Sequence, residues 1–175
     1  MKLDRKHLKV KVFLSLESDQ GQFGEMLVEI ERATIQNLDT LYEIEKKCFQ
    51  NDQMDKQQIA YWINISNGIC LVSRVKHEIV GFIIGRIQIE NESRNGHILT
   101  VDVLPGYRCR GIGSKLLEEI EEIFRNEGAK KCHLEVREDN IPALKLYKKV
   151  GYEEAEILEN YYGATNGIRF KKHLT

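Results

Sequence analysis

The stretch from Thr100 to Phe124, TVDVLPGYRCRGIGSKLLEEIEEIF, constrains the fold more than any other part of the sequence. Its first residues alternate between apolar and polar and predict a strand, which a Pro-Gly pair ends. Apolar residues then recur at helical spacing and predict a helix from about Gly113 to Glu127, ended by Gly128. The apolar stripe of this helix comprises Leu116, Leu117, Ile120, Ile123 and Phe124. A glycine-rich loop therefore joins a strand to the start of a helix.

The loop RCRGIGSK combines three features of an anion site. Its glycines permit a close approach of the backbone to a ligand, and the helix start leaves N–H groups unpaired at the positive end of the helix dipole. Arg108 and Arg110 add full positive charges. A phosphate or pyrophosphate suits such a site. The sequence lacks the Gly-Lys-Ser/Thr of a Walker loop and the three-glycine dinucleotide fingerprint, which favours a phosphate site of another class. The alternative is a loop that only needs glycine to turn.

The bulk composition is typical of a single globular domain. The chain has 175 residues, of which 42% are apolar and 30% charged. A net charge of −1 argues against bulk electrostatic binding to nucleic acid or membranes. The sequence has neither a recognisable signal peptide nor an apolar run near the roughly 20 residues that span a bilayer, so we expect a cytoplasmic protein. The four cysteines form no Cys-x-x-Cys pair, so we expect free thiols and no metal site.

The rest of the chain alternates between strand and helix patterns. We expect strands at residues 8–17, 26–34, 68–75, 78–90, 97–104, 130–137, 151–158 and 167–174. Further helices are expected at residues 35–49, capped by Thr34, at 54–66, capped by Asp52 or Asp55, and in a short segment capped by Asn140. This order predicts an α/β or α+β fold whose sheet has a parallel portion.

Two motifs resemble those of the GNAT N-acetyltransferase superfamily. Arg108-x-x-Gly111-x-Gly113 resembles the signature that holds the pyrophosphate of acetyl-CoA, and LEVREDNIPALKLYKKVGY resembles the second half of that cofactor site. The second motif is particularly similar to those of ribosomal-protein-alanine N-acetyltransferases and archaeal N-terminal acetyltransferases. The resemblance covers about residues 27–174.

The resemblance implies a fold and a cofactor. The implied fold is a mixed central sheet, flanked by helices, whose fourth and fifth strands splay apart. Acetyl-CoA is the implied cofactor, with its pantetheine arm in the gap between these strands. The implied cofactor-binding residues are Val101, Asp102, Val103, Arg108, Cys109, Arg110, Gly111, Ile112, Gly113, Ser114, Asn140 and Tyr147. The GNAT domain would span residues 26–175. Residues 1–25 lie outside the family pattern and are expected to add a strand, which either extends the sheet or pairs with a neighbouring molecule.

Three residues are candidates for catalysis. Glu135 lies in a predicted buried strand, where a carboxylate is costly without a purpose or partner. It is either a general base or a salt-bridge partner of Arg137 or Arg86, and the match to the LEVR motif favours the base. The resemblance makes His97 a second base that works with the glutamate through water, and Tyr147 the acid that protonates the leaving thiolate. Without the resemblance, His97 is a polar residue at a strand entrance and Tyr147 an aromatic side chain packed on its helix.

The implied reaction is direct attack of a primary amine on acetyl-CoA in a ternary complex. The expected acceptor is the N-terminal α-amine of a protein, with ribosomal proteins among the candidates, and the enzyme is expected to be a monomer or homodimer. Tyr161 and Tyr162 resemble the tyrosines that roof the peptide groove, and Phe49 would line its other wall. The segment CFQNDQMDK lacks the proline and aromatic residues that often follow there. The alternatives are an acetyltransferase for a small amine or a lysine side chain, and an inactive CoA-binding regulatory module.

Overall fold

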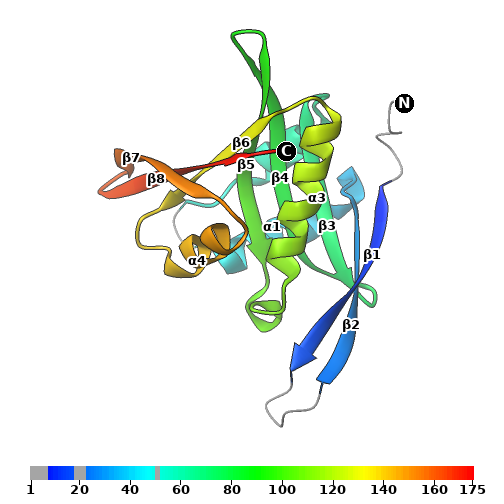
Figure 1. Ribbon diagram of the computed structural model, residues 1–175. Helices are drawn as coiled ribbons and strands as arrows, with labels where there is room; N and C mark the ends of the chain where they lie inside the picture. Colours follow the sequence, from blue (N-terminus) through cyan, green and yellow to red (C-terminus); the bar gives the residue numbers. More distant parts are fainter. Residues whose placement is uncertain (1–7, 18–22, 50–51) are drawn as a thin grey trace.

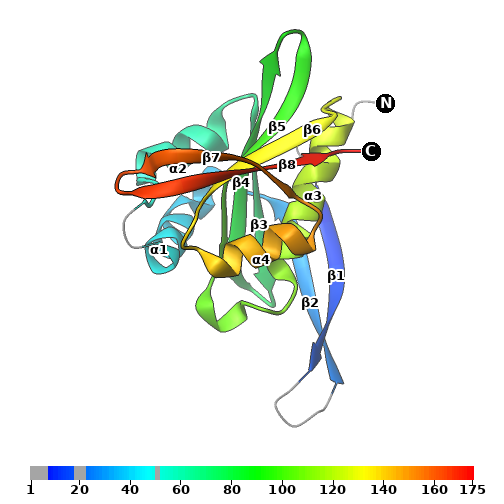
Figure 2. The same cartoon turned by 60° about the vertical axis from the view of Figure 1, so that its left-hand side comes forward.

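The computed structural model describes residues 8–17, 23–49 and 52–175. Within them, eight strands form one sheet in the order β1-β2-β3-β4-β5-β6-β8-β7 (Figures 1 and 2). Neighbouring strands are antiparallel except β5 and β6, which run parallel. A mixed sheet with a parallel portion confirms the predicted fold class.

Most elements lie where the sequence patterns predict them. The strands are β1 (Lys9–Glu17), β2 (Phe23–Arg32), β3 (Gly68–Val75), β4 (Glu78–Glu90), β5 (Ser93–Val103), β6 (Lys131–Arg137), β7 (Glu153–Tyr162) and β8 (Thr165–His173). The α-helices are α1 (Leu38–Cys48), α2 (Lys56–Asn64), α3 (Ile112–Asn126) and α4 (Ile141–Lys149), and the 3-10 helices are η1 (Ile35–Asn37) and η2 (Pro105–Tyr107). The largest differences are at two hairpins: β5 starts at Ser93, four residues before its expected start, and β7 continues through Tyr161 and Tyr162, which we expected in a loop.

Helices cover both faces of the sheet. The apolar side chains of α3 and α4 form one core with the strands, and those of α1 and α2 form a second core on the other face. Residues of β3 alternate between them, with Ile69 and Leu71 in the first core and Cys70 and Val72 in the second. This explains the continuous apolar run ICLV, because a central strand is buried on both faces.

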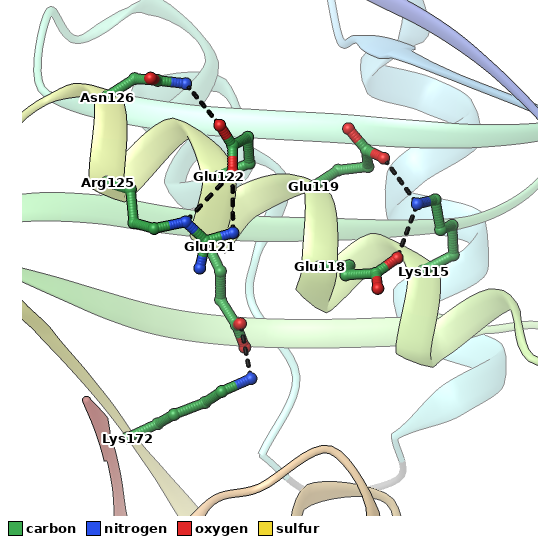
Figure 3. A network of polar contacts seen from close by, with 8 residues as sticks. All are labelled: Lys115, Glu118, Glu119, Glu121, Glu122, Arg125, Asn126 and Lys172. Carbon is green, nitrogen blue, oxygen red and sulfur yellow. Dashed lines mark hydrogen bonds and ion pairs between the residues drawn. The ribbon is translucent and has the colours of Figure 1, made fainter. Parts of the chain in front are cut away.

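The outer face of α3 carries a network of ion pairs (Figure 3). Lys115 contacts Glu118 and Glu119 one turn ahead, and Arg125 contacts Glu122 one turn back. Glu121 is different, because it is buried and receives a 2.7 Å hydrogen bond from Lys172 of β8. This buried ion pair fixes the middle of α3 to the strand on the far side of β6.

β5 and β6 are paired over only part of their length. Parallel pairing runs from Asn95 opposite Lys131 to Ile98 opposite Leu134, and the described chain has no β5–β6 pair beyond that point. β6 stays paired with β8 along its whole length, so β6 and β8 leave β5 together. These are the fourth and fifth strands of the predicted fold when the added strand β1 is not counted. The predicted splay is therefore confirmed.

The added strand β1 forms one edge of the sheet. It pairs with β2 from Lys9 opposite Glu31 to Glu17 opposite Phe23, so it extends the sheet. Its Leu14 lies 3.6 Å from the position that a Cβ atom would take at Gly111. The strand therefore contacts the glycine loop, which is almost 100 residues away in the sequence.

The long apolar helix needed to cross a membrane is not found among the helices of the described residues.

Candidate active site

The point where β5 and β6 part carries a histidine and a glutamate in direct contact. Nε2 of His97 lies 2.7 Å from Oε2 of Glu135, the first β6 residue beyond the paired segment. Oε1 of Glu135 accepts a 2.8 Å hydrogen bond from Arg169 of β8. The sequence suggested Arg137 or Arg86 as the salt-bridge partner of Glu135, and this was wrong. Arg169 takes that place because it lies directly opposite Glu135 in the β6–β8 ladder.

The Glu135 carboxylate is held in its ionised form. Its side chain is only 7% exposed, and burial by itself raises the pKa of a carboxyl group. The hydrogen bonds from His97 and Arg169 outweigh this effect and lower the pKa of Glu135 to about 2. Glu135 is therefore charged at every pH at which the protein would work.

The contacts of His97 indicate which of its ring nitrogens carries the proton. Arg86, its register partner on β4, approaches Nδ1 to 3.4 Å, and a guanidinium can only donate. Nδ1 is then the acceptor, and the proton on Nε2 is donated to Glu135. The ring of His133 stacks on that of His97 with centroids 4.3 Å apart, and burial lowers the pKa of His133 to about 4.

The same residues offer three possible metal ligands. Ligand atoms of His97, His133 and Glu135 lie within 4.8 Å of one another. However, Glu135 already shares its two oxygens between His97 and Arg169, and Arg86 lies on the other side of His97. Two flanking guanidinium groups oppose the binding of a cation. The arrangement is better suited to proton transfer.

The glycine loop follows β5 and opens α3, as predicted. Gly111 is the N-cap of α3 with a φ of 84°, and no side chain of the described residues caps this helix end. The N–H groups of the first turn are therefore available to an anion. Arg110 lies over the Tyr107 ring at 5.5 Å, whereas Arg108 turns back and donates a 2.9 Å hydrogen bond to the Val103 carbonyl. Cys109 is exposed and has a positive φ of 59°.

The two sequence motifs meet in space at Gly113. Leu146 of α4, from the second motif, lies 3.1 Å from the position that a Cβ atom would take at Gly113, in the first. The absence of a side chain at Gly113 thus lets α4 approach the start of α3 closely. α4 begins as predicted, with Asn140 accepting a 3.2 Å hydrogen bond from the Ala143 N–H.

At the end of β5 that is not paired with β6, part of the strand's backbone faces the gap between the two strands. Leu104 donates to the Val80 carbonyl of β4, and in an antiparallel ladder such bonds involve every second residue. The backbone groups of Val101 and Val103 therefore face away from β4, toward the gap, while those of Asp102 face β4. The Val103 carbonyl is already contacted by Arg108 and by the Cys48 thiol.

Tyr147 points from α4 into the core that α3 and α4 share. It is 7% exposed, and its ring contacts those of Tyr152 and Phe170. Burial, with a smaller effect of the Asp102 charge, raises the pKa of Tyr147. The phenol therefore keeps its proton at neutral pH.

The aromatic residues predicted to bind the acceptor lie on two separate elements. Phe49 is the half-buried C-cap of α1, and Tyr161 and Tyr162 form an edge-to-face pair at the end of β7 with centroids 5.0 Å apart. Arg137 connects the two sides: it donates to Asp52, which follows α1, and to Thr165 at the start of β8. The structure therefore places these aromatics on both sides of an ion-paired contact.

Sequence reasoning missed one part of the site. Glu45 lies in the helix predicted at residues 35–49 and was given no role, and Asp102 was only one of the implied cofactor-binding residues. Both are 1% exposed, and their carboxyl groups meet behind β5. A glutamate on an otherwise apolar helical stripe was the available signal.

A surface hollow of about 550 Å³ lies elsewhere, near the far end of α3, with Gly68, Ile89 and Arg94 in its lining. The predicted site residues are not part of that lining.

Comparison with known proteins agrees with this geometry. The chain belongs to the acetyltransferase (GNAT) family, whose model matches residues 38–152. It is 37% identical over 103 residues to an N-alpha-acetyltransferase of Sulfurisphaera tokodaii, a match that covers 52% of this chain and 60% of the relative. An uncharacterized N-acetyltransferase of Methanocaldococcus jannaschii is 30% identical over 137 residues, covering 76% of this chain and 83% of the relative.

The fold also matches solved structures. The crystal structure of the ribosomal-protein-S18-alanine N-acetyltransferase from Escherichia coli aligns with a TM-score of 0.75 at 22% identity, covering 85% of this chain and 94% of that one. At this identity the likeness establishes the fold. The chain spans about 60% of the length of the archaeal N-alpha-acetyltransferases that it matches.

Proposed function

We propose that this protein transfers an acetyl group from acetyl-CoA to the N-terminal α-amine of a protein, by direct attack in a ternary complex. The observation that carries the proposal is the parting of β5 and β6. The glycine loop and an open helix start lie at one end of this gap, and the His97–Glu135 pair lies at the other. Residues 26–175 are the proposed catalytic domain, and residues 1–25 an extension of it.

In this proposal the gap holds the cofactor. The residues from Cys109 to Ser114, among them Arg110, bind the pyrophosphate of acetyl-CoA. Asn140, at the start of α4, contacts the cofactor as well. The pantetheine arm pairs with the strand segment Val101–Val103, where the outward backbone groups of Val101 are the best placed. The cofactor supplies the activated acetyl group, and the chain supplies binding, orientation and proton transfer.

Proton transfer is assigned to His97 and Glu135 acting together. An α-ammonium group has a pKa near 8, so direct transfer to a carboxylate whose pKa is about 2 is uphill by roughly 8 kcal/mol. Imidazole is better matched to this task at neutral pH. His97 therefore takes the proton at Nδ1, directly or through water, in place of the 3.4 Å contact from Arg86, while Glu135 accepts the Nε2 proton and orients the ring.

Tyr147 is the proposed acid. Its buried phenol remains protonated and donates to the thiolate of CoA as the carbon–sulfur bond breaks. The ammonium nitrogen loses two protons as it becomes an amide. The first goes to His97 and from there to solvent. The second leaves as the tetrahedral intermediate collapses and replaces the proton that Tyr147 gives to the thiolate, so the products are the amide, CoA and one released proton.

The acceptor is assigned from the two aromatic walls and from the relatives. Phe49 on one side and Tyr161 with Tyr162 on the other would enclose the first residues of a peptide. Relatives named N-alpha-acetyltransferase, and one named for the alanine of a ribosomal protein, support a protein N-terminus as acceptor and make ribosomal proteins candidates. A cytoplasmic location is consistent with such an acceptor.

A panel of peptides tests the proposal. Peptides with different free N-termini are incubated with the protein and acetyl-CoA, beside a peptide whose N-terminus is blocked and whose lysine is free. We expect transfer to some of the free N-termini and little to the blocked control. Transfer to lysine alone would contradict the acceptor assignment. CoA binding without any transfer would favour an inactive regulatory module.

A further inference from the structure

Two buried carboxyl groups, from Glu45 of α1 and Asp102 of β5, lie together behind the gap. Each residue is 1% exposed. Oδ2 of Asp102 accepts a 2.8 Å hydrogen bond from the Thr100 hydroxyl, and Oε1 of Glu45 accepts a 2.8 Å hydrogen bond from the Met54 N–H. One oxygen of each carboxyl group is therefore satisfied by an ordinary donor.

The remaining oxygen of each carboxyl group has no such donor. Oε2 of Glu45 and Oδ1 of Asp102 are buried and lack a donor among the described residues. The two side chains are within hydrogen-bonding reach, but two carboxylates can form such a bond only when they share a proton. Two adjacent ionised carboxylates in a buried site would also repel each other strongly. One shared proton therefore satisfies the hydrogen bonding of the pair, whereas without a proton the two oxygens stay unsatisfied.

The surroundings of the pair favour this singly protonated state. Burial, followed by the Asp102 charge, raises the pKa of Glu45 to about 8. Burial also raises the pKa of Asp102 to about 6, opposed by hydrogen bonding to Thr100, Glu45 and the Cys48 thiol and by the charge of Arg108 in the glycine loop. The other titratable groups near Asp102 are the Cys48 thiol of α1 and the Tyr147 phenol of α4. Both have raised pKa values and are neutral at pH 7.

The pair joins elements that the proposed reaction needs to hold together. Asp102 lies between Val101 and Val103, in the segment of β5 that is paired with β4 but not with β6. Glu45 holds α1 and, through Met54, the chain just before α2. A second and weaker contact runs in parallel, from the Cys48 thiol to the Val103 carbonyl at 3.5 Å. Phe49, a proposed acceptor-binding residue, directly follows this end of α1.

We propose that Glu45 and Asp102 are a proton-sharing positioning pair. Their common proton holds α1 and Phe49 against the segment of β5 that is not paired with β6. The role of the pair in catalysis rests on the proposed function, whereas its protonation does not. Loss of the proton at alkaline pH weakens the contact and loosens the acceptor side of the site. The segment Val101–Val103 stays paired with β4 and the glycine loop is not held by the pair, so acetyl-CoA binding changes less.

Infrared spectroscopy tests the shared proton without any substrate. The carbonyl stretch of a protonated carboxylic acid is recorded for the full chain at pH 7. We expect this band in the wild type and its loss in both E45Q and D102N, because an amide in either position donates to the remaining carboxylate. E121Q is the matched control, since Glu121 is equally buried but ion-paired to Lys172, and the band should persist in it. Absence of the band from the wild type, or its persistence in both E45Q and D102N, would overturn the proposal.

Kinetics test the positioning role. The KM for an acceptor peptide is compared between the wild type and E45Q, which carries a permanent donor, so that titration of the peptide itself cancels. The ratio should be near one at pH 7 and rise to about tenfold at pH 9, where only about a tenth of the pairs keep their proton. The KM for acetyl-CoA should follow the same course in both proteins. A flat ratio in an active enzyme refutes the positioning role alone, whereas an absence of acetylation refutes the proposed function and leaves the infrared test decisive for the pair.

Discussion

At the scale of single residues, two buried carboxyl groups on different elements of the site differ in protonation. Glu135 is surrounded by donors and stays ionised, whereas Glu45 faces another carboxyl group and keeps a proton. Burial alone would raise the pKa of both. The difference between them comes from Arg169 and His97, which contribute charge and hydrogen bonds to Glu135.

Replacement of Glu135 by glutamine should lower kcat by about 10²–10⁴-fold, because His97 loses the carboxylate that accepts its Nε2 proton and orients its ring. The KM for acetyl-CoA should change little, since the glycine loop is distant from this pair. Steady-state kinetics measure both quantities. E156Q is a suitable control, because Glu156 also pairs with Arg169 but does not contact His97. Equal losses in the two variants would contradict the assigned role.

Glu135 should also make stability depend on pH. Its folded-state pKa of about 2 lies below the ordinary 4.5, so its stabilising contribution is complete above pH 4.5 and is lost as the pH falls toward 2. About 2 kcal/mol of the free energy of unfolding should be lost from this residue by pH 3. Urea unfolding of the wild type and E135Q at pH 7 and pH 3 measures the difference. The same loss in both proteins would show that the Glu135 carboxylate is not the group responsible.

At the scale of elements, the sequence patterns predict the strands, the helices and the position of the glycine loop well. α3 starts within a residue of its predicted position because its stripe and its glycines are local signals. The partners of Glu135 could not be predicted in the same way. Arg169 is 34 residues away, and only the β6–β8 register brings it to the site. The Glu45–Asp102 contact likewise depends on how α1 packs on the sheet.

The glycine loop gives a test at this scale. Gly111→Ala should weaken CoA binding several-fold, because alanine at a φ of 84° costs about 1 kcal/mol and favours a shift of the loop backbone. CoA titration followed by calorimetry gives the dissociation constant. Gly128→Ala is the matched control, since Gly128 has a φ of 85° at the other end of α3. The control should lose stability but keep its CoA affinity, and equal weakening in both variants would contradict the loop's role.

At the scale of the whole molecule, the fold brings the N-terminal strand next to the glycine loop. β1 lies outside the segment that matches the family model, yet its Leu14 lies close to Gly111. The sequence indicated the strand by its alternating pattern, but left open whether it pairs within the chain. Its pairing with β2 follows from the register of the hairpin.

Leu14→Ala should therefore act on the loop as well as on stability. We expect a loss of about 1–2 kcal/mol of unfolding free energy, which is small for a buried leucine because Leu14 is only half-buried. We also expect weaker CoA binding. Phe13→Ala, which changes the neighbouring and 64% exposed side chain, is the control and should alter neither quantity greatly. Unchanged CoA affinity in Leu14→Ala would show that β1 does not affect CoA binding by the loop.

The central claim is transfer of an acetyl group to a protein N-terminus, and competition within one molecule tests it most directly. A peptide carrying both a free α-amine and a free lysine is incubated with the protein and acetyl-CoA, and fragmentation mass spectrometry locates the added acetyl group. We predict acetylation of the α-amine in the wild type and almost none in E135Q. Acetylation of the lysine in preference to the α-amine, or equal modification with and without the Glu135 carboxylate, would contradict the account.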